Sequence, residues 1–123
     1  MATRDEVISI LRLFKGCIML DRLMVKGRQE NTQGLIDLGI TPDQRREILL
    51  GLTPDNYSAG PKPDDTDYTK EIWEFGCEVG GMEVYIKLRV VPDPRKKSVF
   101  HAMLWSFHRA RHPMKYPLRG VER

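Results

Sequence analysis

The sequence has little cysteine and no long apolar run. Its two cysteines, Cys17 and Cys77, stand alone with no Cys-x-x-Cys spacing, which argues against a disulfide scaffold or a zinc cluster. No apolar stretch is long enough to span a bilayer, and the first residues lack the pattern of a signal or transit peptide. We therefore expect a cytoplasmic protein with no membrane partner, no metal site and no cofactor.

Internal repeats and low-complexity segments are also absent. The chain has 123 residues, of which 41% are apolar and 30% charged. This length allows one core but leaves no room for a second, and the balance of apolar and charged residues is typical of a folded chain. The composition predicts a single domain over residues 1–123.

Basic residues are concentrated toward the C-terminus. Residues 86–123 hold 10 Lys and Arg against two acidic residues, whereas residues 1–85 hold 10 against 15. The same region contains the three histidines of the chain, His101, His108 and His112. Local basicity of this kind binds polyanions, although a solvated basic surface, including a basic tail over 109–123, has the same composition.

The N-terminal half shows helical periodicity with clear helix-end signals. Thr3 and Glu6 have the spacing of a capping box, and Thr41 and Gln44 repeat it. Gly39 is suited to end a helix. The sequence predicts, in order, a helix over Arg4–Cys17, a helix over Thr32–Leu38, and a helix from Thr41 to near Gly51. Between the first two, the segment Ile18–Val25 is either a short strand, which we favour, or more helix.

The segment 53–69 contains three prolines and five Asp or Asn residues. These residue types favour turns and irregular backbone. The composition therefore predicts a loop without regular structure over 53–69. A loop of this length is either functional or mobile, and the alternative is a plain surface connector.

Beyond residue 69 the period changes from helical to alternating. Alternation predicts strands over Lys70–Val79, Glu83–Val91 and Ser98–His108, and Gly80 with Gly81 supplies a hairpin turn between the first two. We expect an α+β fold in which N-terminal helices pack on one face of a C-terminal antiparallel sheet.

The open face of this sheet is the candidate site. If Val84, Ile86 and Leu88 face the helices, then Tyr85, Lys87 and Arg89 face away from them. The same argument places His108 and Ser106 on that face from the next strand and Glu74 from the strand before. Sheet faces that carry aromatic and basic side chains are RNA-binding platforms. We expect Trp73 and Trp105 to lie in the core instead.

Cleavage of RNA through its 2′-hydroxyl needs a base, an acid and cations that hold the phosphate. Glu74 or His108 is the candidate base, and His108 or Tyr85 the candidate acid. No metal is needed for this chemistry. Each residue also has a structural interpretation: Glu74 as an ion-pair partner across the hairpin, and Tyr85 as a packing residue. His108 and His112 have the spacing of a helical zinc pair, but Pro113 follows directly and no third ligand is evident.

Four motifs carry a family resemblance: GLTPDNYSAGPKPD, EIWEF, GMEVYIKLRV and LWSFHRARHPMKYPLR. In this order, over about residues 34–119, they resemble the MqsR family of toxins from bacterial toxin–antitoxin pairs. The resemblance implies a RelE-like α+β fold and a messenger-RNA interferase, a sequence-specific endoribonuclease that arrests growth. It also implies a cognate antitoxin with a helix-turn-helix domain, encoded alongside the toxin.

The family's site residues carry over unevenly. The family tyrosine is retained as Tyr85, followed by Lys87, whereas Glu74 and His108 stand where the best-known member has Gln and Lys. A further family lysine falls on Ala59, and Lys62 lies close enough to replace it. The predicted RNA-binding residues are Lys62, Lys87, Arg89, Arg109, Arg111 and Lys115.

Two other functions remain open at this point. One is a non-catalytic module that binds RNA or a protein through the same face, and the other is a toxin that cleaves messenger RNA only on translating ribosomes.

Overall fold

The computed structural model describes residues 1–64 and 67–120. The elements are α1 (Arg4–Met19), β1 (Leu23–Val25), α2 (Gln29–Leu38), α3 (Pro42–Leu50), a 3₁₀ turn (Pro54–Asn56), β2 (Tyr57–Asp64), β3 (Asp67–Val79), β4 (Met82–Pro92) and β5 (Phe100–Arg109). Residues 65–66 of the predicted loop and 121–123 of the predicted tail lie outside the described residues.

The helix ends follow the capping signals of the sequence. At α1, Glu6 N–H donates to Thr3 Oγ1 at 3.2 Å, and Thr3 N–H donates back to the Glu6 carboxylate at 2.9 Å. Thr41 and Gln44 repeat this box at α3. Gly39 ends α2 with a left-handed φ of 67°, a conformation that favours glycine. All three predicted helices are confirmed, with α1 two residues longer and α2 three residues longer than expected.

The sheet has five strands in the order β1-β5-β4-β3-β2. The antiparallel meander β3-β4-β5 matches the three predicted strands, and β1 pairs with β5 in parallel. Of the segment Ile18–Val25, only Leu23–Val25 forms a strand, because α1 continues to Met19. The predicted α+β fold is confirmed, with two strands more than the meander.

The prediction of irregular backbone over 53–69 is wrong for β2 and for the first three residues of β3, which begins at Asp67. Strand β2 pairs with β3 from Tyr57 to Asp64, with register shifts along its length. Proline lacks a backbone N–H and is tolerated in edge strands such as β2, which have a neighbouring strand on one side only. Pro61 and Pro63 are therefore compatible with this strand. Tyr57 is fully buried and receives a hydrogen bond from Ala2 N at 3.0 Å, which ties this edge to the start of α1.

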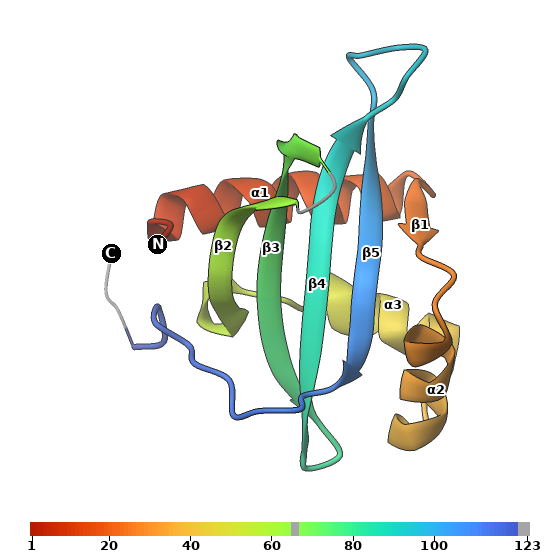
Figure 1. Ribbon diagram of the computed structural model, residues 1–123, viewed down its shortest axis with the longest axis vertical. Coiled ribbons are helices and arrows are strands. Elements are labelled where there is room, and N and C mark those ends of the chain that lie inside the picture. Colours follow the sequence, from red (N-terminus) through yellow and green to blue (C-terminus); the bar gives the residue numbers. More distant parts are fainter. Residues whose placement is uncertain (65–66, 121–123) are drawn as a thin grey trace.

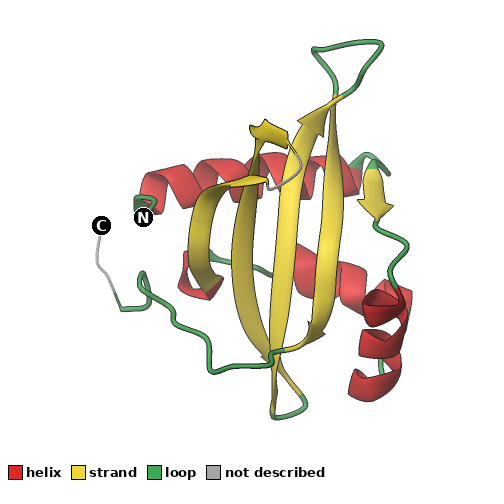
Figure 2. Ribbon diagram, viewed as in Figure 1, coloured by secondary structure: helices red, strands yellow, loops and turns green. Residues whose placement is uncertain are grey.

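The hydrophobic core lies between the sheet and the helices α1 and α3, which cover one face (Figure 1). Helix α2 packs beside β5 at the other end of the sheet from β2. Fully buried side chains come from both layers: Val7, Phe14, Leu49, Phe75, Val84, Ile86, Leu88, Leu104 and Phe107. No helix of the described residues covers the second sheet face (Figure 2), and this is the face on which the sequence places its candidate site.

Candidate functional site: a basic hollow on the open sheet face

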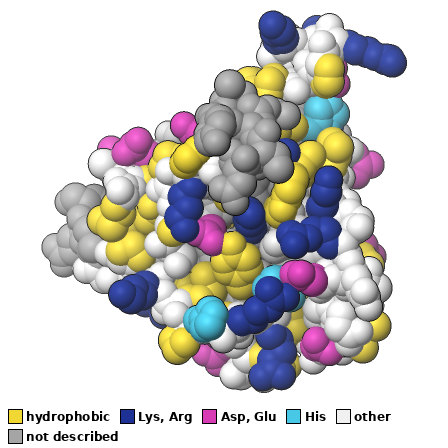
Figure 3. All heavy atoms as spheres, in the orientation of Figure 1, with side chains coloured by type: hydrophobic (Ala, Val, Ile, Leu, Met, Phe, Trp, Pro, Cys, Tyr) yellow, Lys and Arg dark blue, Asp and Glu magenta, His cyan; other side chains and the backbone are white. Residues whose placement is uncertain are grey.

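The open face contains a hollow of about 640 Å³. Viewed from this side, Lys, Arg and His side chains surround an apolar patch, with acidic side chains between them (Figure 3). Seven of the predicted site residues line the hollow: Lys62, Glu74, Tyr85, Lys87, His108, Arg111 and Lys115. The structure thus brings together most of the residues that the sequence singled out.

Strand register explains this convergence. Tyr85 in β4 lies opposite His108 in β5, and Lys87 lies between Glu74 of β3 and Ser106 of β5. Directly opposed residues on one face of an antiparallel pair have their side chains within contact distance. The period-two argument from the sequence is therefore confirmed for these five positions.

Glu74 is held by hydrogen bonds from two sides. The Tyr85 hydroxyl donates a hydrogen bond to Glu74 Oε2, and Lys62 Nζ lies 2.5 Å from Glu74 Oε1. Burial raises the pKa of Glu74, but the hydrogen bonds from Lys62 and Tyr85 and the charges of Lys62 and Lys87 outweigh it, so the net pKa lies below 4.5. Glu74 is therefore a carboxylate at neutral pH. The structural alternative of an ion pair across the hairpin is met in part, because Lys87 lies opposite Glu74 and its charge acts on the carboxylate, while the hydrogen bonds come from Lys62 and Tyr85.

Tyr85 has the opposite shift. Burial raises its pKa, and the hydrogen bond to the Glu74 carboxylate raises the pKa further. The phenol therefore stays protonated at neutral pH and acts as a hydrogen-bond donor to Glu74.

His108 lies against Tyr85, with the two ring centroids 5.4 Å apart. Its Nδ1 is 2.8 Å from the Arg109 carbonyl oxygen, which only accepts, so Nδ1 carries a proton. Its Nε2 lies 3.4 Å from Glu30 Oε2. Both ring nitrogens thus face oxygen atoms.

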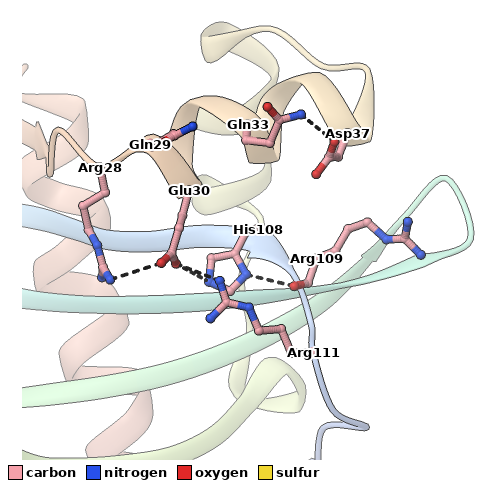
Figure 4. Close-up of a pocket in the computed structure, with 8 residues that line it drawn as sticks. All are labelled: Arg28, Gln29, Glu30, Gln33, Asp37, His108, Arg109 and Arg111. Carbon is pink, nitrogen blue, oxygen red and sulfur yellow. Dashed lines mark hydrogen bonds and ion pairs between the residues drawn. The ribbon is translucent and has the colours of Figure 1, made fainter.

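Glu30 joins the site from α2, and the sequence analysis did not identify it. Its carboxylate also pairs with Arg111 at 3.1 Å and with Arg28 at 3.6 Å (Figure 4). These residues, Arg28, Glu30, His108 and Arg111, line both the main hollow and a second one of about 490 Å³ between α2 and the end of β5. The sequence signal that could have identified Glu30 is the closely spaced pair of charges, Arg28 and Glu30, at the start of a helix.

Helix α2 is fixed to β5 at this point by two residues. The buried Asn31 side chain donates to the carbonyls of Lys26 at 2.9 Å and Trp105 at 3.1 Å, and accepts from Phe107 N–H at 2.9 Å. Gly34 permits the close approach, because a Cβ there would lie 2.3 Å from the Phe107 carbonyl oxygen. These contacts hold Glu30 over His108.

Two predicted RNA-binding residues do not line the main hollow. Arg89 is on the predicted face but only 7% exposed, with its guanidinium 4.6 Å from the centre of the Trp105 ring. Arg109 is exposed, and its side chain points away from the Glu30 cluster (Figure 4). The expectation that both tryptophans are core residues holds for Trp73, which is 5% exposed, and is wrong for Trp105, which is half-buried on the open face.

The predicted basic tail returns to the sheet, as far as the structure describes it. Glu83 accepts hydrogen bonds from Met114 N and from the Tyr116 hydroxyl, both at 2.9 Å. Gly76 leaves room for this crossing, because a Cβ there would lie 2.5 Å from the Tyr116 hydroxyl oxygen. The tail thereby forms one wall of the hollow, through Met114 and Lys115.

Within the described part of the chain, no group of three His, Cys, Asp or Glu residues has the geometry of a metal site. His108 and His112 are not on a helix, so their spacing does not place them on one helical face. None of the helices in residues 1–64 and 67–120 is long and apolar enough to cross a membrane.

Comparison with protein-family models, with curated proteins and with solved structures gave no match to this chain. The resemblance to the MqsR toxins therefore stays a prediction from sequence motifs.

Proposed function

We propose that this protein is an endoribonuclease that cleaves messenger RNA through the ribose 2′-hydroxyl, without a metal ion. The observation that supports this most is the group of Glu74, Tyr85 and His108 in one hollow lined by cations. It offers a carboxylate base, a fixed phenol and an imidazole acid beside groups that attract a phosphodiester.

In the proposed reaction Glu74 takes the proton of the 2′-hydroxyl. The 2′-oxygen forms a bond to phosphorus, the bond from phosphorus to the 5′-oxygen breaks, and His108 gives its proton to that oxygen. The products are a 2′,3′-cyclic phosphate and a 5′-hydroxyl end. The lowered pKa keeps Glu74 ionised before substrate arrives, and it also makes the carboxylate a weaker base than an ordinary Glu.

Tyr85 acts here as a positioning residue for Glu74. Its raised pKa makes proton release unfavourable, which disfavours Tyr85 as the acid. Lys87 and Arg111 hold the phosphate charge that develops during the reaction, and Lys62 keeps Glu74 ionised. A phosphate bound at His108 competes with Glu30 for His108 and Arg111.

The biological part of the proposal comes from the sequence resemblance. We propose that RNA cleavage arrests growth, that the protein is the toxin of a toxin–antitoxin pair in the cytoplasm, and that an antitoxin encoded alongside it binds it. The LWSFHR motif supports this, because it supplies Ser106 and His108 to the hollow.

Inducible expression in a bacterial host tests this function. Wild-type protein is expected to arrest growth and to create new 5′ ends in messenger RNA, detected by primer extension, and His108→Ala to do neither. His101→Ala is the matched control, because His101 bonds to Asp93 near the β4–β5 turn and does not line the hollow. Growth arrest by His108→Ala contradicts the assignment, and RNA binding without any product supports a non-catalytic module.

A further inference from the structure

A β-bulge places Trp105 on the open face. Lys87 of β4 pairs with Ser106, but the next residue, Leu88, pairs with Leu104, so Trp105 is an extra residue in β5. Leu104 and Phe107 are both fully buried on the core side. A bulge turns a side chain away from the regular alternation, and here it moves a large aromatic ring out of the core and toward the basic side chains of the open face.

Three cations surround the Trp105 ring. The Arg89 guanidinium lies 4.6 Å from the ring centre, Lys26 Nζ 4.8 Å and Lys87 Nζ 5.8 Å. Arg89 is buried, whereas Lys26 is exposed and Lys87 half-buried. Arg89 therefore supports the ring from within the sheet, and the two lysines lie at its more exposed side. A partly exposed indole beside two lysines is suited to stack a nucleobase while the lysines bind the phosphates on either side.

Trp105 is also continuous with the candidate active site. Lys87 lies within reach of the ring and lines the main hollow, and Arg28 of that hollow donates to Ser106 Oγ at 3.2 Å, directly beside Trp105. Tyr85 and Lys87 are two residues apart on β4, a distance of about 7 Å. An extended RNA strand with its scissile phosphate near His108 therefore passes over Trp105 within a short run of nucleotides.

We propose that Trp105 is a base-stacking subsite that fixes one nucleotide of single-stranded RNA beside the cleavage site, with Lys26 and Lys87 on the flanking phosphates. This proposal rests on the proposed function, because the RNA substrate is the same. Trp105 would then contact a nucleobase, in addition to the contacts that the basic side chains make with phosphate. Stacking alone tolerates any base, so Trp105 sets the position of the strand rather than the sequence that is cut.

Tryptophan fluorescence tests this proposal directly. The probe is a short unstructured RNA of mixed sequence, titrated into His108→Ala protein so that the RNA stays intact, and the control probe is a sugar–phosphate oligomer of equal length without bases. We expect RNA to quench the fluorescence saturably and the base-free oligomer to leave it nearly unchanged. The only other tryptophan, Trp73, is buried, so Trp105→Phe in the same background is expected to remove most of the quenching.

Affinity measurements give a second readout. Trp105→Ala is expected to weaken RNA binding about tenfold to hundredfold, with little effect on the base-free oligomer, and Trp105→Phe to restore much of the lost affinity. Equal binding of both oligomers by wild type and Trp105→Ala overturns the subsite and leaves RNA cleavage at His108 unaffected. Quenching by RNA in a protein that never cleaves supports the subsite while the proposed function fails. No RNA binding at all overturns both proposals.

Discussion

At the scale of single residues, the central feature is the pair formed by Glu74 and Tyr85. Burial raises the pKa of the phenol, and the hydrogen bond to Glu74 raises it further. Burial also raises the pKa of the Glu74 carboxyl group, but the hydrogen bonds from Lys62 and Tyr85 outweigh it and lower the net pKa. Glu74 is therefore an ionised carboxylate at neutral pH, with the Tyr85 hydroxyl in place as its hydrogen-bond donor.

The lowered pKa of Glu74 predicts an acid-dependent change in stability. A carboxyl group whose pKa is lower in the folded state stabilises the fold at pH values above its ordinary 4.5, and this stabilisation is lost as the pH falls through the folded value. We expect Glu74→Gln to unfold more easily than wild type at about pH 7, and the difference to shrink below about pH 4. Urea unfolding across this pH range measures it.

The matched control is Glu78→Gln, which removes an exposed carboxylate from the same strand. A difference between wild type and Glu74→Gln that stays constant with pH contradicts the assigned ion pair.

At the scale of elements, the contact between α2 and β5 shapes the site. The Asn31 side chain donates to the Trp105 carbonyl and accepts from the Phe107 N–H, which are backbone groups at the bulge. Gly34 lets the helix approach the strand closely. Glu30 is positioned over His108 by the same helix. The bulge, the imidazole and the cation cluster therefore depend on one helix–strand contact.

Loss of the Asn31 amide is expected to be costly. Asn31→Ala removes three hydrogen bonds and leaves buried backbone groups of Lys26, Trp105 and Phe107 without this partner. We expect the free energy of unfolding to fall by about 2–3 kcal/mol, measured by urea denaturation. Gln33→Ala, at an exposed position of the same helix, is expected to change it by less than about 0.5 kcal/mol. Equal effects of the two variants contradict the role given to Asn31.

Elements with local signals were predictable, whereas strand β2, which depends on its place at the edge of the sheet, was not. The capping boxes at Thr3 and Thr41 and the glycine at residue 39 are determined by residues within one turn of each other. Strand β2 was missed because its prolines argue against a strand unless the strand is known to be at an edge. The short strand predicted within Ile18–Val25 is confirmed as β1, but its three-residue extent depends on pairing with β5.

The same distinction applies to the site. Tyr85, Lys87 and Glu74 were placed correctly because the hairpin at Gly80 and Gly81 fixes their register. Trp105 was misplaced because strict alternation ignores a bulge. The signal was in the sequence, since Leu104 and Phe107 are three residues apart and cannot both face the core in a regular strand.

At the scale of the whole molecule, the basic half of the sequence contributes to one hollow on the open sheet face. The basic C-terminal region supplies β4, β5 and the tail, and α2 adds Arg28 beside them. Five Lys and Arg side chains line the hollow, where they attract a polyanion over a distance set by salt screening: Arg28, Lys62, Lys87, Arg111 and Lys115.

This distribution predicts how RNA binding responds to salt. Each phosphate contact that is lost reduces the slope of log affinity against log salt concentration by about 0.7 for a single strand. We expect Arg111→Ala to reduce the slope by this amount, measured with RNA in the His108→Ala background. Arg12→Ala, on α1 and away from the hollow, is the control and is expected to leave the slope unchanged. If Arg111→Ala leaves the slope of log affinity against log salt concentration unchanged, Arg111 does not contact an RNA phosphate.

The most direct test of the account is cleavage of RNA by the purified protein in the absence of ribosomes. Wild type is expected to cut a single-stranded transcript and to leave 2′,3′-cyclic phosphate and 5′-hydroxyl ends. His108→Ala and Glu74→Gln are each expected to be slower by a factor of about 100 or more while remaining folded. Transcripts that are bound but stay intact, or cleavage at the wild-type rate by both variants, would contradict the claim that these residues form a nuclease site.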